Sequence, residues 1–132
     1  MVKVLRDLWI LTVSGTTVYS RVIDPRFEVN PQLFGALMSA LNTFAQKLTD
    51  EGMSNFELSK IRFSIVKRNK FLFVASSSNK IKSKKIFKEL RDISDKFFEL
   101  YPEETLKKWD SDVGLFDTFE ATIQDSLEDK PK

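Results

Sequence analysis

The first apolar run of the chain reads LWILTV (residues 8–13). Apolar residues at consecutive positions predict a strand that is covered on both faces, and such a strand belongs in the middle of a sheet. Gly15-Thr16 separates this run from TVYSRV (residues 17–22), and a two-residue connection that begins with glycine suits a type II′ hairpin. We therefore expect the two runs to pair antiparallel, with Trp9 buried at the centre of the sheet.

A second run of this kind reads FLFVA (residues 71–75), and it predicts another central strand. Before it, apolar residues alternate with polar ones over residues 56–58 and again over residues 61–65, which predicts two strands with a break at 59–60. Residues 67–70 are the expected turn. The chain thus contains five predicted strands.

Helical spacing marks the remaining segments. Asn30-Pro31 is a favourable helix start, apolar residues then recur at helical spacing to Leu48, and Gly52 marks the stop. An amphipathic helix follows over residues 86–101 and ends before Pro102, and a last helix is expected over residues 106–127.

These elements predict an α+β fold in one domain, residues 1–127, followed by a frayed polar tail, residues 128–132. We expect a five-stranded antiparallel sheet of order 2-1-5-4-3. One helix is expected on one face and the two C-terminal helices on the other.

This order of elements resembles the longin domain over about residues 4–127. The local sequence agrees at three places, which are LWIL (8–11), FLFV (71–74) and FFELY (97–101). The related roadblock family places a helix before its first strand, so longin is the closer variant. The chain departs from longin SNAREs, which continue into heptads and a membrane anchor, and from adaptor small subunits, whose characteristic arginine- and tyrosine-containing strand is missing near residues 61–73.

The resemblance implies a profilin-like architecture and a non-enzymatic interaction module. Such a module dimerises with a second copy or with another longin- or roadblock-like chain, and it serves small GTPase regulation or vesicle trafficking. A different class of function is a sensory or small-ligand-binding domain of profilin-like or PAS-like type. A cavity large enough for a metabolite between sheet and helix would favour that alternative.

Composition argues against most enzyme chemistry. The chain has no His and no Cys, and its four glycines form no phosphate-binding loop. Asp110-Ser111-Asp112 lacks the rest of an EF-hand loop. We therefore predict no catalytic residues, no metal site and no cofactor.

Charge and hydropathy bear on partners and location. The net charge is only +2 and no aromatic residues alternate with the lysines, so we expect no nucleic-acid partner. The N-terminus becomes charged before a signal-peptide core could form, and no apolar run is long enough to span a membrane. The expected location is the cytoplasm, with a peripheral position at membranes as an open alternative.

The first predicted helix is unusual because residues 29–46 carry no charge. A helix on a sheet normally shows charged residues to water, so this face is either a merely polar surface, a face buried by the chain's own loops, or a subunit interface. The neighbouring strand would supply an unpaired edge. The predicted interface comprises Gln32, Gly35, Ala36, Ser39, Ala40, Asn42, Thr43, Gln46, Phe56 and Leu58.

Basic residues are concentrated in one part of the chain. Residues 60–91 hold eleven of them against one acid, Glu89. Three lysines, at 82, 84 and 85, lie near a predicted helix start, where the helix dipole disfavours cations. The segment is either a solvated lysine-rich surface or a site for an anionic membrane surface or an acidic partner. The predicted basic surface comprises Lys67, Arg68, Lys70, Lys80, Lys82, Lys84, Lys85 and Lys88.

Overall fold

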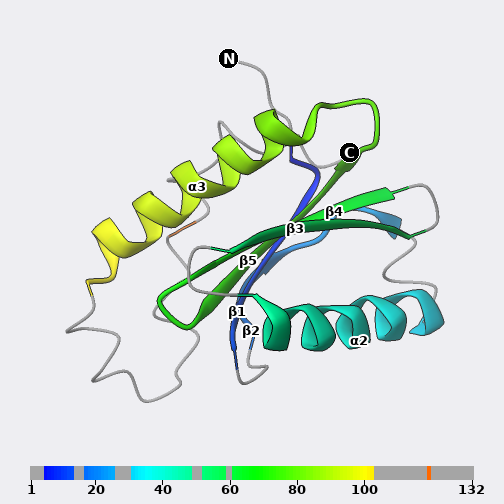
Figure 1. Cartoon of the computed structure of the whole chain (residues 1–132), viewed down its shortest axis with the longest axis horizontal. Coiled ribbons are helices and arrows are strands. Elements are labelled where there is room, and N and C mark those ends of the chain that lie inside the picture. Colours follow the sequence, from blue (N-terminus) through cyan, green and yellow to red (C-terminus); the bar gives the residue numbers. More distant parts are fainter. Residues whose placement is uncertain are drawn as a thin grey trace.

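The computed structural model describes residues 5–13, 17–25, 31–48, 52–58, 61–102 and 119. These residues form five strands and two helices (Figure 1). In chain order they are β1 (Asp7–Thr12), β2 (Thr17–Arg21), α2 (Pro31–Lys47), β3 (Met53–Leu58), β4 (Ile61–Arg68), β5 (Phe71–Ser78) and α3 (Ser83–Leu100).

The strands form one antiparallel sheet of order β2-β1-β5-β4-β3, which confirms the predicted order. β1 and β5 lie inside the sheet, and Trp9 on β1 stands opposite Ser20 on one side and Val74 on the other. Trp9 is only 2% exposed, as predicted. The break expected between residues 58 and 61 does separate β3 from β4.

The turn between β4 and β5 is tighter than the sequence suggested. Only Asn69 and Lys70 form it, with φ angles of 49° and 68°. Two successive residues of positive φ are the signature of a type I′ turn, whose twist matches that of the flanking strands. Lys67 and Arg68, which were expected in the turn, instead belong to β4, where Arg68 pairs with Phe71.

Side chains that alternate along the strands divide the core into two layers. Leu8 and Ile10 point to the side of α3, whereas Trp9 and Leu11 point to the side of α2, so the helices lie on opposite faces of the sheet (Figure 1). The α3-side core contains Leu5, Leu8, Ile10, Val18, Val66, Phe71, Phe73, Ala75, Ile86, Leu90, Ile93, Phe97, Tyr101 and Phe119. The α2-side core contains Trp9, Leu11, Leu37, Leu41, Ile61, Phe63, Ile65, Leu72 and Val74.

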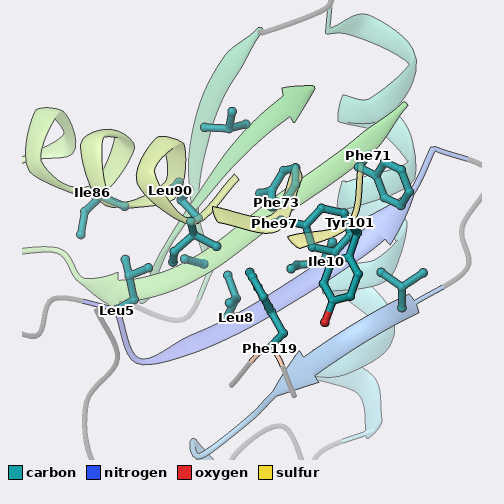
Figure 2. Packing of buried hydrophobic residues seen from close by; sticks show 14 residues of the cluster. Leu5, Leu8, Ile10, Phe71, Phe73, Ile86, Leu90, Phe97, Tyr101 and Phe119 are labelled. Carbon is teal, nitrogen blue, oxygen red and sulfur yellow. The ribbon is translucent and has the colours of Figure 1, made fainter. Parts of the chain in front are cut away.

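Helix α3 is held by one buried stripe at helical spacing, which runs from Ile86 through Leu90 and Ile93 to Phe97. The Phe97 ring centre lies 5.4 Å from that of Phe71 and 5.5 Å from that of Phe73, and Figure 2 shows these rings gathered over the sheet. The helix ends just before Pro102, as predicted, and the Tyr101 amide donates to the Phe97 carbonyl at 2.8 Å.

The predicted last helix lies outside the described residues except for Phe119, and so do the Gly15-Thr16 connection and the tail. Phe119 is helical and fully buried. Its ring meets that of Tyr19 edge-on, with ring centres 5.6 Å apart. Its ring centre also lies 5.5 Å from that of Phe97 (Figure 2). A residue near the C-terminus thus completes the α3-side core.

Candidate functional site

The outer face of α2 presents polar, uncharged side chains. Ser39, Asn42, Thr43 and Gln46 are exposed, and Ala40 is half-buried. The Thr43 hydroxyl donates to the Ser39 carbonyl one turn earlier at 3.1 Å. This part of the predicted interface is therefore accessible on one helix face, over about two turns.

The rest of the predicted interface lies on α2 and β3. Gln32, Gly35 and Ala36 belong to the first two turns of α2 and Leu58 to the end of β3, but their side chains are outside the described part. Phe56 is half-buried and stacks on Phe63, with ring centres 5.2 Å apart. Because Phe56 packs on the α2-side core, it links β3 to the face that carries α2.

Strand β3 is an edge of the sheet, and its hydrogen-bond pattern can be read from one bond. The Lys67 amide donates to the Gly52 carbonyl at 3.0 Å. Hydrogen-bonded pairs alternate in an antiparallel ladder, so the next ones are Ser54 with Ile65 and Phe56 with Phe63. The backbone groups of residues 53, 55 and 57 consequently point away from β4. They form a row of donors and acceptors that another strand could pair with.

The side chains of these same three residues lie on the α3 face. Residues directly opposite in a ladder share a face, and Asn55 stands opposite Ser64 and Glu57 opposite Arg62. Two contacts agree with this: Asn55 Nδ2 lies 3.5 Å from the Ser83 hydroxyl oxygen, and Glu57 Oε1 lies 3.8 Å from Arg62 Nη2. Helix α3 packs mainly on β4 and β5. It reaches β3 through Ser83 and through Arg91, whose Nη2 lies 2.7 Å from Met53 Sδ.

A groove of about 1010 Å³ occupies this region, between Met53 of β3, the β5–α3 connection and the outer side of α3. We call it the basic groove. Its apolar lining consists of Met53, Ile81 and Phe87, and Met53 is 44% exposed. Its cations are Lys80, Lys82, Lys84, Lys85, Lys88 and Arg91.

Two carboxylates, those of Asp92 and Asp95, also line the basic groove. Six cations against two carboxylates give the groove a formal charge of +4, which exceeds the +2 of the whole chain. Both carboxylates are already paired, Asp92 with Lys88 at 3.3 Å and Asp95 with Arg68. Within the described residues, none of the lysines at 80, 82, 84 and 85 has an ion-pair partner.

The structure divides the predicted basic surface between several places. Five of its lysines line the basic groove, but Lys67 lies on the α2 face, where its ammonium donates to the Leu48 carbonyl at 3.1 Å. Arg68 lies on the α3 face, donates to the Ser94 hydroxyl at 2.7 Å and stands over the Phe98 ring at 5.5 Å. Lys70 is exposed at the tip of the β4–β5 turn. Basic residues that are close together in the sequence therefore lie on more than one surface of the folded chain.

Arg62 helps to hold the basic groove in shape. Its Nη1 donates to the Ile81 carbonyl at 2.8 Å and to the Ser83 hydroxyl at 3.2 Å. The same guanidinium reaches Glu57 on β3. One half-buried side chain thus ties the edge strand to the start of α3, a role that the sequence did not indicate because Arg62 appears there only as one basic residue among eleven.

A second group that the sequence did not single out is Asp7, which is fully buried. Its Oδ1 accepts from the amides of Ile23 at 2.6 Å and Asp24 at 3.1 Å, and its Oδ2 accepts from the Ser76 hydroxyl at 2.5 Å. Ser76 Oγ in turn accepts from the Asp7 amide at 3.0 Å. With its oxygens used in this way, the carboxylate anchors the chain after β2 to the central strands.

Within the described residues, no three His, Cys, Asp or Glu side chains gather as a metal ion would require. Asp110 and Asp112 lie outside those residues. No helix in the described part of the chain combines the length and the apolar character needed to cross a lipid bilayer. Comparison with models of known protein families gives no match, and comparison with curated protein sequences gives none either.

Proposed function

We propose that this chain is a non-enzymatic, longin-like interaction module that pairs with a second copy or with a similar chain. The observation that carries the proposal is the exposed, uncharged face of α2, with Ser39, Asn42, Thr43 and Gln46 turned to solvent. A helix packed on a sheet usually places charged side chains on its outer face, because charge is best solvated there. A partner that covers this face accounts for their absence.

Helix α3 provides a comparison within the same molecule. It packs on the opposite face of the same sheet, and its outer side carries Lys84, Lys88, Arg91 and Asp95. The two helices are of similar length, so size does not explain why α2 carries no charge before its last residue, Lys47. The difference is the one expected between a helix covered by a partner and a helix left in water.

The edge of β3 supplies a second element of the proposed contact. Its outward backbone groups, at residues 53, 55 and 57, would pair with β3 of another copy and extend the sheet. Antiparallel pairing of β3 with itself has two-fold symmetry, and it would place the α2 helices of the two copies on the same side of the extended sheet. Neutral residues suit such a contact because no charge then faces its own copy.

The class of biological partner rests on the resemblance to longin domains. We propose a cytoplasmic platform, free or peripheral at membranes, that supports small GTPase regulation or membrane trafficking. The α2 and β3 contact and the class of partner are separate parts of the proposal, and each has its own test.

The test is sedimentation velocity on the wild-type protein and on the double variant Ser39→Arg with Gln46→Arg, from dilute to concentrated solution. We expect a wild-type dimer, or a complex with a similar chain, that the variant does not form, because two buried charges lack partners. The control is Lys84→Glu with Lys88→Glu on the opposite face, which should dimerise normally. A wild-type monomer with no bound partner, or a dimer that survives the α2 substitutions, would refute the assignment.

Affinity capture from the native lysate tests the partner class. Wild-type bait should recover small GTPases or longin- or roadblock-like chains, and the α2 double variant should lose the longin-like ones. Recovery of a metabolic enzyme alone would count against the proposal.

A further inference from the structure

The basic groove is a concave, positively charged site on the face of the sheet opposite α2. We propose that it binds an acidic segment of a partner protein in which carboxylates flank an apolar side chain. The inference does not rest on dimerisation, because the cations of the groove lie on the β5–α3 connection and on α3, and only Met53 belongs both to the groove and to the β3 edge.

The positive charge of the groove indicates that its ligand is negatively charged. Lys82, Lys84 and Lys85 stand at the start of α3, where the helix dipole disfavours a nearby cation. The first turn of α3 holds no acidic residue to offset this, and the N-cap residue Lys82 makes no side-chain capping hydrogen bond. Like charges crowded in one groove also repel each other, so carboxylates placed among these lysines relieve both costs.

The shape and lining decide between a peptide and a membrane. A bilayer offers a flat surface of head groups, whereas these lysines surround a hollow of about 1010 Å³. The lining of the hollow is partly apolar, with an exposed Met53 and half-buried Ile81 and Phe87. An apolar side chain of a peptide can enter this space and remove Met53 from water, while neighbouring carboxylates reach the lysines. The flexible Met53 side chain also adapts to different apolar partners.

The groove is built before any partner arrives. Arg62 joins β4 to Ile81 and Ser83, and Asn55 of β3 also reaches Ser83. These contacts fix the β5–α3 connection against the edge strand, so little backbone ordering is needed on binding, which favours affinity.

The experiment measures fluorescence anisotropy of a short labelled peptide in which a phenylalanine is flanked by glutamates, at physiological salt. Three other probes accompany it: the same peptide with glutamine for glutamate, the same peptide with serine for phenylalanine, and phosphatidylcholine vesicles with and without phosphatidylserine. The wild-type protein should bind the acidic phenylalanine peptide and bind the glutamine peptide at least about tenfold more weakly.

Charge reversal locates the site. Lys84→Glu with Lys88→Glu should weaken binding of the acidic peptide by about tenfold or more, since two attractions become repulsions. The control, Lys47→Glu with Lys70→Glu, makes the same change in net charge at exposed positions outside the groove and should stay within about twofold of wild type. Met53→Ser should weaken binding of the phenylalanine peptide but not of the serine peptide.

Far-UV circular dichroism and thermal unfolding verify that each variant is folded, and Lys84→Gln with Lys88→Gln replaces the charge reversal if that variant does not fold. The proposal is overturned if the acidic and glutamine peptides bind equally, or if the control variant loses as much affinity as the groove variant. Binding of phosphatidylserine vesicles without binding of the peptide also overturns it and assigns the surface to membranes.

Discussion

Replacing Asp7 tests whether its buried carboxylate holds the central strands and the chain after β2 together. In Asp7→Ala the amides of Ile23 and Asp24 lose their acceptor, and a buried donor left without one costs about 1–3 kcal/mol. The Ser76 hydroxyl loses its acceptor as well. We expect a loss of about 3–5 kcal/mol, a large part of the roughly 5–15 kcal/mol that stabilises a domain.

The milder variant Asp7→Asn separates the hydrogen bonds from the packing. Its amide oxygen can still accept from the two backbone amides, and its NH₂ group can donate to the Ser76 hydroxyl oxygen. We expect a loss of about 1–2 kcal/mol, since bonds to a charged acceptor become bonds to a neutral one. Asp95→Ala is the matched control, because Asp95 pairs with Arg68 at the surface with its side chain 64% exposed, and its loss should cost under about 1 kcal/mol.

Urea unfolding followed by tryptophan fluorescence measures these differences, with Trp9 on β1 as a buried reporter. The slope of the free energy against urea concentration should stay constant across the series, so that midpoint shifts report stability. The reasoning fails if Asp7→Ala costs no more than Asp95→Ala. It also fails if Asp7→Asn is as damaging as Asp7→Ala, because the loss would then not follow the hydrogen bonds.

Two further predictions use the same unfolding assay. Leu11→Ala opens a cavity in the α2-side core and Phe73→Ala one in the α3-side core, and each should lower the free energy of unfolding by about 2–5 kcal/mol. The control Leu100→Ala, at a position 48% exposed, should cost far less. Equal losses of stability in all three variants would contradict the assigned cores. Lys70→Gly should raise stability by about 0.5 kcal/mol, because a non-glycine residue at φ 68° is strained and glycine is not; a clear decrease would contradict the type I′ turn.

Much of the fold follows from local patterns in the chain. Consecutive apolar residues in 8–11 and 71–75 predicted strands buried on both faces, and both are central strands. Asn30-Pro31 and Pro102 marked where a helix begins and where another ends, because these residues act on the backbone beside them. The absence of charge between residues 29 and 46 is likewise visible without a structure, although whether a partner covers that face stays a prediction.

The composition of the sites was decided by tertiary structure. Asp7 is 69 residues from Ser76 in the chain, and nothing near Asp7 in the sequence indicates that its carboxylate is buried. The basic residues between 60 and 91 likewise lie in different places in the folded chain. Lys67 lies on the α2 face, Arg68 bonds to Ser94 and Asp95, and the lysines after β5 line the basic groove. The spacing of apolar residues and the turn and cap residues act on the backbone within a few positions, and they therefore determine where helices and strands form. Which face a charge occupies, and which group it meets, depends on strand register and helix packing, which only the folded chain sets.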